Sequence, residues 1–297
     1  MTATGIAPPV YVDAPSVQRH RFGLFSVSAS PETFDRVEAG VEWEPYPGAA
    51  AGIADIACDV SNRDGWPLDP IDACDVADVT VTPFVVVGAY SGPGVATRPR
   101  DDWQARAREH LRGGEERAVE YAIASGAVEV RPTLSDATDL TGGTAVDVPE
   151  GIALLESWLA ASHHSPGVLH VPRVIVPYAL DRGQVRRDGE RIETVLGTGI
   201  AAGAGYDLAV RAGHGPAPSG SGEAWLYATP RPRIRRSDVW VGPDRDEWLN
   251  RRDNTVEVYA MRTYAVGWDV GAAAVLVNAP DVPDPASPAG APSGGTP

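Results

Sequence analysis

The sequence predicts an α+β protein in which one long helix shares a core with several strands. Three observations indicate this class. The 297 residues include 32 glycines and 27 prolines, which favour turns and strands over a helix bundle. Apolar residues recur at helical spacing over 101–125, and β-branched and aromatic residues dominate 79–90 and 255–268. The length suits one elaborated domain or two joined ones.

The first part of the chain is predicted to be mostly extended. Residues 1–20, rich in proline and small side chains, indicate an arm, and 55–78 indicate an acidic loop. The apolar segment 22–27 is expected to form a strand, with which the alternating segment 41–46 could pair. Residues 79–90 predict a buried strand.

Residues 101–125 give the strongest helix signal. Asp101 and Asp102 suit the positive N-terminal end of a helix, and Gly126 supplies a C-terminal stop. Gly113 and Gly114 each cost about 1 kcal/mol relative to alanine, so we expect a bend there or two abutting helices. One apolar stripe is formed by Trp103, Ala107, Leu111, Ala118, Ala122 and Ile123.

The rest of the chain alternates helices and strands before a low-complexity tail. Helices are predicted over 149–162 and 172–183, with a strand over 167–170 between them. From residue 185 onward the pattern is mainly strands and turns. The predicted segments are strands over 223–229, 234–241 and 255–268, a loop over 211–222 and a disordered tail over 279–297.

The charge of the chain narrows the range of partners. The formal net charge is −15, and all 25 basic residues are arginine, because the sequence contains no lysine. An acidic surface repels phosphate, which disfavours tight DNA binding but suits a container whose wall must not stick to packed nucleic acid. No apolar run approaches the ~20 residues that cross a bilayer, and residues 1–10 lack a secretion signal. We therefore expect no membrane contact and a protein made and used in a cytoplasm.

The glycine-rich segment 197–203 superficially resembles a dinucleotide-binding loop. Such a loop must lie between a strand and a helix, whose first amide groups hold the pyrophosphate. Residues 204–207 (Ala-Gly-Tyr-Asp) are poor helix material. We therefore expect a tight turn between strands and no cofactor.

Two further sets of side chains are weighed as metal ligands and not assigned. The aspartates of 59–78 could supply calcium ligands, but Arg63 occupies a ligand position of the calcium-loop pattern. A solvated loop is favoured, and a weak ion between subunits stays open. Cys58 and Cys74 lack CxxC partners, which argues against zinc. Free thiols are favoured in a reducing compartment, and a disulfide stays open.

No catalytic set emerges from the remaining candidates. Adjacent His163 and His164 would point about 100° apart on a helix, and His170 fits a plain core position. Residues 219–222 lack the spacing of a nucleophile elbow. We therefore assign no catalytic, cofactor-binding or metal-binding residue and expect no enzyme. The basic cluster 231–236 is either a strand entry whose arginines pair with acids or a salt-bridge seam between subunits.

The order of several segments resembles the Hong Kong 97 fold of tailed-phage major capsid proteins, which encapsulins share. Residues 115–126 resemble the acidic, alanine-rich end of the family's spine helix, and 167–172 resemble the entry to its axial domain. Residues 196–200 resemble its LG-x-P-V turn, with glycine where proline is common.

The C-terminal strands carry the resemblance further. Residues 227–239 and 256–277 resemble the family's returning strands, with Arg262 matching a frequent arginine. The resemblance covers about residues 100–278. It is nearest to capsid proteins of phages that infect actinobacteria, in keeping with the arginine-only composition of a GC-rich genome.

The resemblance implies a division of the chain. The expected parts are an N-terminal arm (1–20), an extended β-hairpin loop and acidic loop (21–78), a peripheral domain (79–148) with the spine helix at about 101–125, an axial domain (149–228), strands returning to the peripheral domain (229–278) and a disordered tail (279–297).

The resemblance also implies a role as a structural major capsid protein. Copies would form hexamers and pentamers of an icosahedral virion head, assembled in the host cytoplasm around double-stranded DNA that is contacted only non-specifically. The expected partners are the chain itself, a separate scaffolding protein, a portal and a candidate decoration protein. Residues 21–46 are predicted to contain the hairpin that overlaps adjacent subunits, and Trp43 and Trp66 are candidate interface anchors.

Two departures from some family members bear on assembly. Some relatives join their subunits through lysine–asparagine bonds, which a chain without lysine cannot form. We expect non-covalent shells that give single-chain bands on denaturing gels, with Cys58 or Cys74 as the remaining route to a crosslink. The chain also lacks the long N-terminal scaffolding segment of some relatives, so a separate scaffold is expected.

Other functions compete with this one. An encapsulin-type compartment shell has the same fold and would lie beside a cargo-enzyme gene, whereas a phage capsid gene would lie beside terminase and portal genes. A tail-associated enzyme or binding module is a different class. It would need a pocket with convergent carboxylates, which the sequence does not show.

Overall fold

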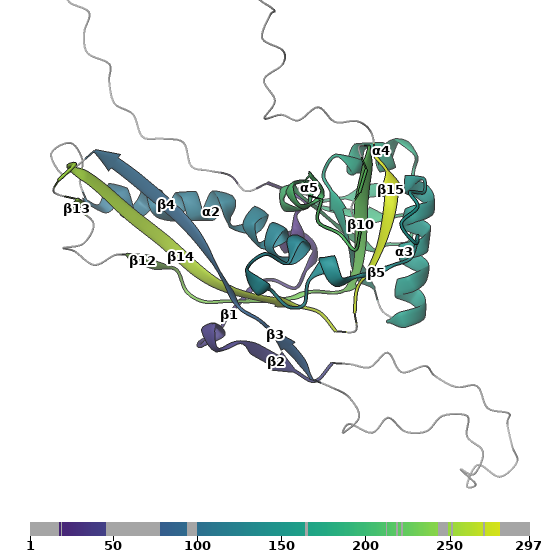
Figure 1. Ribbon diagram of the computed structural model, residues 1–297, viewed down its shortest axis with the longest axis horizontal. Coiled ribbons are helices and arrows are strands. Elements are labelled where there is room, and N and C mark those ends of the chain that lie inside the picture. The colour runs from purple at the N-terminus through teal and green to yellow at the C-terminus, as the bar shows by residue number, and fades with distance from the viewer. Residues whose placement is uncertain are drawn as a thin grey trace, which may run out of the picture.

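The computed structural model is an elongated molecule built from two large β-sheets, a small two-stranded sheet (β2 and β3) and a long helix (Figure 1). It describes residue 18 and residues 20–45, 78–93, 100–163, 166–211, 213–217, 219–220, 222–242, 249–250, 252–269 and 271–279. The arm up to residue 17, most of the acidic loop with Cys58, Cys74 and Trp66, and the tail from 280 lie outside this range.

The helices and strands follow one another in a mixed order. The helices are α1 (Leu24–Val27), α2 (Arg100–Ser125), α3 (Val148–Ser162), α4 (Ile175–Asp181) and α5 (Ala204–Arg211), with 3-10 turns η1 (Val37–Ala39), η3 (Ala127–Glu129) and η4 (Leu134–Asp136). The strands are β1 (Glu32–Thr33), β2 (Val41–Trp43), β3 (Val79–Val81), β4 (Phe84–Pro93), β5 (Thr138–Asp139), β6 (Gly167–Pro172), β7 (Val185–Asp188), β8 (Arg191–Thr194), β9 (Gly199–Gly203), β10 (Glu223–Pro230), β11 (Arg233–Arg236), β12 (Trp240–Gly242), β13 (Leu249–Asn250), β14 (Thr255–Gly267) and β15 (Ala273–Asn278).

The first sheet is a long ribbon built around β14. This strand pairs antiparallel with β4, from Thr255 opposite Pro93 to Tyr264 opposite Phe84, and also with β11, β12 and β13. Figure 1 shows α2 lying along the β4–β14 ribbon. Gly88 allows this close approach, because a side chain at that position would collide with the backbone of Leu111.

The second sheet is buried on both faces. Its strand order is β5-β15-β10-β6-β9-β8-β7, and every residue of β6 is buried. Alternate residues of β6 enter two different cores: Val168 joins a core with α2 and α5, whereas Leu169 joins a core with α3 and α4. Helices therefore cover both faces, which explains the continuous apolar run of this strand.

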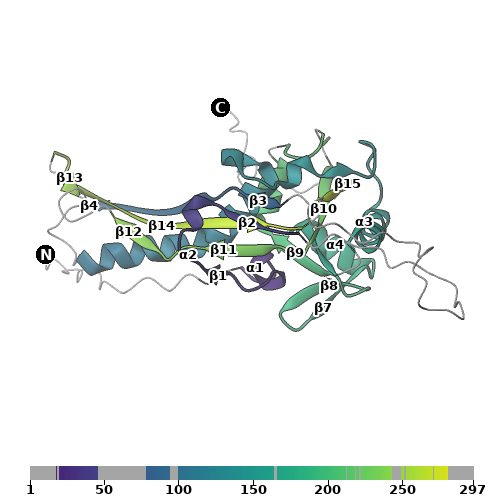
Figure 2. The ribbon, with the colours of Figure 1, turned by 90° about the horizontal axis from the view of Figure 1, so that it is seen from below.

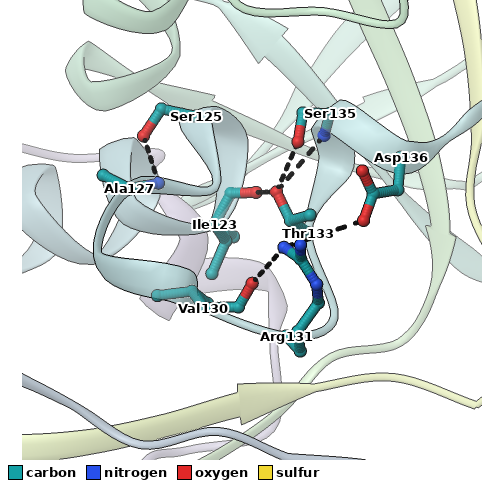
Figure 3. A network of polar contacts seen from close by, with 8 residues as sticks. All are labelled: Ile123, Ser125, Ala127, Val130, Arg131, Thr133, Ser135 and Asp136. Atoms are coloured by element: carbon teal, nitrogen blue, oxygen red, sulfur yellow. Dashed lines mark hydrogen bonds and ion pairs between the residues drawn. The ribbon is translucent and has the colours of Figure 1, made fainter.

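The C-terminal end of α2 is closed by local hydrogen bonds (Figure 3). Gly126 adopts a left-handed conformation with φ of 64°, and its N–H donates to the carbonyl of Ala122 at 3.0 Å. The hydroxyl of Thr133 donates to the carbonyl of Ile123 at 2.9 Å, and the Ser125 hydroxyl accepts from the Ala127 N–H at 3.1 Å. The predicted glycine stop is therefore confirmed.

Several elements predicted from the sequence are confirmed, and the differences have physical causes. The helices predicted over 101–125 and 149–162 are present as α2 and α3. Of the two expectations at Gly113 and Gly114, two abutting helices are wrong, because α2 is one continuous helix that packs along the ribbon. The segment predicted as one strand over 234–241 is interrupted and forms β11 and β12.

The prediction for residues 22–27 is wrong. Residues 24–27 form the short helix α1, whose amide groups bond to α2, and β2 pairs with β3 rather than with this segment. A hairpin confined to residues 21–46 is also wrong, because the described residues of this range do not pair with one another: β1 pairs with β11, and β2 pairs with β3. The predicted overlap of this segment with adjacent subunits stays a prediction.

Glycine substitutions test how α2 packs on the ribbon. We expect Gly88→Ala to lower the free energy of unfolding by roughly 1–3 kcal/mol, because the added methyl group has no room beside Leu111. Gly114→Ala is the matched control. Gly114 lies in α2, where no atom lies within 4 Å of the new methyl group, so the variant should raise stability by about 0.5–1 kcal/mol. Urea unfolding followed by tryptophan fluorescence measures both, and a neutral Gly88→Ala would contradict the close packing.

Candidate functional site

Three glutamates on α2 form the main polar cluster inside the described chain. Glu115 and Glu120 are each only 1% exposed, and Glu116 is half-buried. A buried carboxylate is costly unless donors satisfy its oxygens. The three side chains find these donors in three different parts of the fold, so the glutamate cluster connects elements that are distant in sequence.

Glu115 is bound by two side chains of β14. The Arg262 guanidinium donates to Glu115 Oε2 at 3.0 Å, and the Tyr264 hydroxyl donates to the same oxygen at 2.7 Å. Burial raises the pKa of the Tyr264 hydroxyl to about 12, and the Glu115 charge adds to this effect. The phenol therefore stays a donor at physiological pH. Arg262, singled out by the family resemblance, is thus the partner of a buried acid.

Glu120 and Glu116 bind backbone N–H groups instead. Glu120 accepts from Leu24 at 2.9 Å with one oxygen and from Gly205 at 3.1 Å with the other. Glu116 accepts from Phe25 at 2.8 Å. Burial raises the pKa of Glu120 from its ordinary value of 4.5 to about 8, opposed by the Leu24 hydrogen bond. The cluster therefore ties α1, α2 and α5 together.

The glycine-rich segment 197–203 leads into this cluster. It forms a turn and β9, as predicted, but the expectation that residues 204–207 are not helical is wrong, because they begin α5. Gly205 lets α5 approach α2, since a side chain there would collide with the backbone of Arg117. At the helix start that a pyrophosphate would need, the Gly205 N–H already donates to the Glu120 carboxyl group.

The histidines lie in structural positions. His170 is fully buried between the Tyr206 hydroxyl and the Thr229 hydroxyl, each 2.8 Å from one ring nitrogen. Burial lowers the pKa of His170 to about 3, so the ring is neutral, as expected for a core histidine. His163 is buried at the C-terminal end of α3, and His164 lies outside the described residues.

The basic cluster 231–236 pairs with acids of its own chain. Arg233 lies 3.6 Å from Asp269, and Arg235 forms an ion pair with Glu32 of the neighbouring strand β1. Trp43 donates to Asp269 at 2.6 Å and stacks under Arg233. Of the two interpretations, the strand entry paired with acids therefore holds for Arg233 and Arg235.

The outer face of the ribbon is apolar. Alternate residues of β4 point away from α2, and Val85 and Val87 are 54% and 51% exposed. Val87 lies opposite Met261 of β14, which in turn lies opposite Trp240 of β12, itself 53% exposed. We call these four residues and the strands that carry them the open face. The strands that carry these residues, β4, β14 and β12, are labelled in Figures 1 and 2.

Two shallow hollows lie beside α3, on either side of the turn that follows β8. Their volumes are about 390 and 380 Å³, and both are lined by Leu196, which is 76% exposed, and by Glu156. Glu156 accepts hydrogen bonds from the Thr194 and Thr198 hydroxyls. A single carboxylate that holds a turn together does not form an acid–base pair.

The described residues show neither a metal site nor a membrane span. In that part of the chain no three histidine, cysteine, aspartate or glutamate side chains are arranged to hold a metal. No helix within the same ranges is both long and apolar enough to cross a bilayer. The predicted ligand loop, 59–77, lies outside the described residues, so the interpretation of its aspartates stays a prediction.

The comparisons with solved structures concern the whole fold. The chain is similar to the capsid of Ralstonia phage GP4 (TM-score 0.57, 11% identity, 96% of this chain and 98% of that chain) and to the capsid of a native GTA particle (TM-score 0.56, 10% identity, 93% and 97%). It is also similar to a chain of Microbacterium phage Oxtober96 (TM-score 0.53, 13% identity, 91% and 95%). No family model and no curated protein matches. The chain therefore has the α+β fold of phage capsid proteins, as the sequence predicted.

A double-mutant cycle tests the Glu115 ion pair. Arg262→Met should lower the free energy of unfolding by about 3–5 kcal/mol, because it leaves the Glu115 carboxylate buried without its cation. Glu115→Gln combined with Arg262→Met should recover part of this loss, since no buried charge remains.

Arg131→Met is the control for the cycle. Arg131 pairs with Asp136 at 3.7 Å, but both side chains are more than half exposed. An exposed pair contributes about 0–1 kcal/mol, so this variant should unfold nearly as the wild type does in urea. Equal effects of the two arginine substitutions would contradict the importance of the buried pair.

Proposed function

We propose that this chain is a structural, non-enzymatic capsid protein of a tailed-phage-type virion, which assembles with copies of itself into the hexamers and pentamers of an icosahedral head around double-stranded DNA. The observation that carries the proposal is the extent of the fold similarity. It spans 91–96% of this chain and 95–98% of each capsid chain compared above. Similarity from end to end favours the same kind of subunit over a shared domain in an unrelated machine.

Within this proposal the parts of the fold take the roles expected from the sequence. α2 acts as the spine helix, the ribbon around β14 belongs to the peripheral domain, and the sheet around β10 belongs to the axial domain. Residues 21–46, expected from the sequence to overlap adjacent subunits, keep that role in the proposal. The net charge of −15 limits contact with packaged DNA to weak, non-specific encounters.

The open face is the proposed contact surface between copies. The side chains of Val85, Val87 and Trp240 are each more than half exposed, and Val87 and Trp240 lie on either side of Met261 of β14. Contiguous exposed apolar surface on a soluble subunit marks an interaction site. When copies of the chain pack against one another through the open face, these apolar side chains are removed from water, although the core of the single chain does not cover them.

The partners and chemistry of assembly are proposed on the same basis. Copies of the chain would assemble with a separate scaffolding protein and a portal, and a decoration protein is a further candidate. The subunits would be held without lysine–asparagine bonds, because the sequence contains no lysine.

Electron microscopy of the purified protein, alone and co-expressed with the scaffold gene from its own genome, tests the proposed function. We expect closed shells built from hexamers and pentamers, which separate into single-chain bands on denaturing gels with reducing agent. A protein that stays monomeric in both preparations would contradict the proposed assembly. Bands that remain crosslinked after reduction would contradict the proposed absence of covalent bonds between subunits.

Charged substitutions test the open face. Val85→Glu combined with Val87→Glu should lower the yield of shells at least about ten-fold, because burying two carboxylates in an interface without partners costs several kcal/mol. The matched control is Val85→Thr with Val87→Thr, which keeps the β-branched shape and places no charge on the face. Circular dichroism should show both variants folded. Normal shells from the glutamate variant would exclude the open face as a contact surface.

A further inference from the structure

The segment that enters the fold before α1 is held to the body by four polar contacts. Ala202 of β9 donates to the Phe22 carbonyl at 2.6 Å, and Arg173 donates to the Arg21 carbonyl at 3.0 Å. The Leu24 and Phe25 N–H groups donate to Glu120 and Glu116, as described above. Residues 21–27 thus depend on acceptors and donors from α2, β9 and the residues before α4, and we call them the latch.

Two of the four contacts share one titratable centre. Glu116 and Glu120 are one helical turn apart on α2, so their side chains lie on the same face. One oxygen of each comes up against Gly23, where a side chain would collide with both. The neighbouring Phe22 has φ of 70°, a left-handed conformation that non-glycine residues avoid. The latch therefore holds an unfavourable backbone conformation, which its contacts to the two carboxylates must offset.

We propose that the latch is a proton-dependent fastening: it closes tightly on α2 when the Glu116–Glu120 pair holds a proton and loosens when both groups are ionised. The only chemical step is the loss of one proton to water from the pair. Ionisation places two like charges in a buried space, and the repulsion can be relieved when the latch lifts and water reaches the carboxylates.

The sign of the pH dependence follows from burial. The folded pKa of Glu120, about 8, lies above its ordinary value of 4.5, so the closed latch binds the proton more tightly than the open latch does. The extra stability of the closed form is complete below about pH 4.5 and is lost progressively as the pH rises toward 8. Above about pH 8, Glu120 is ionised in both the closed and the open latch, so the free-energy difference between the two forms no longer changes with pH.

Other charged and titratable groups face this centre and modulate it. Arg173 lowers the pKa of Glu120, whereas the Glu116 charge raises it. The pKa of the buried Tyr206 hydroxyl is raised by burial and then by these two acids, so it stays neutral over the range of interest. The groups that face Glu120 are His20 before α1, Glu116 and Arg117 on α2, Arg173 before α4 and Tyr206 on α5.

Hydrogen–deuterium exchange of the full-length protein tests the latch. The peptide that covers residues 22–28 is followed between pH 6 and 9, and its rate at each pH is divided by the rate of an unstructured reference peptide. Wild-type protection should fall roughly 10- to 100-fold over this range. Protection of a peptide from α3 should not change, which separates local opening from global unfolding.

Variants assign the effect to the carboxylate pair. Glu120→Gln cannot ionise, so the latch should keep constant protection from pH 6 to 9. Glu116→Gln removes a neighbouring charge, so the decline should level off at a lower pH than in the wild type. Glu150→Gln, which alters an exposed acid of α3, should keep the wild-type profile.

Either of two results would overturn the latch: a flat wild-type profile, or a slope that persists in Glu120→Gln. If Glu120→Gln does not fold, the profile of Glu116→Gln decides, since an unchanged decline would exclude the pair. The latch rests on contacts within one chain, so it stands or fails independently of whether copies of the chain form shells.

Discussion

The burial of acidic side chains on one helix, Glu115 and Glu120 almost completely and Glu116 in part, is the constraint on which the rest of this fold depends. Each carboxylate needs donors, because a buried charge without partners is far too costly to keep. Glu115 takes its donors from β14, whereas Glu116 and Glu120 take theirs from the chain before and within α1 and from α5. The ribbon, the N-terminal segment and the second sheet are therefore all positioned relative to α2 by directional hydrogen bonds, which fix orientation more sharply than apolar packing does.

The sequence predicts those elements whose pattern is local. α2 and α3 follow from apolar stripes and end signals, and β6 and β14 from apolar and β-branched runs. α1 and α5 could not be found this way. α1 has only four residues and depends on acceptors more than 90 positions away, and α5 tolerates Gly205 because that glycine lets it approach α2. In both helices tertiary contacts override local propensity.

The glutamate cluster shows the same limit more strongly. In the sequence, Glu115, Glu116 and Glu120 fit the polar face of a helix, and nothing in their spacing indicates burial. Their burial follows only from the elements that pack against α2 in the folded chain, namely α1, α5 and β14. The one sequence signal that pointed here was Arg262, noted as a frequent arginine of the resembled family, and its carboxylate partner lies 147 positions earlier. An arginine inside a mostly apolar strand is therefore a reason to look for an acid on the helix that packs against that strand.

The outward residues of β4 on the open face are more apolar than a solvent-facing strand requires. A sheet with one face in water should alternate apolar and polar residues, because only one face needs to exclude solvent. On β4 the inward residues Phe84 and Val86 are buried against the core, yet the outward residues Val85 and Val87 are also valines. The core on the α2 side is already closed, so these outward valines add nothing to the stability of a single chain. Exposed valines on this face are the composition that a covering surface would require, and α2 covers only the opposite face of the ribbon. This departure from alternation is therefore the physical basis of the proposed contact between copies.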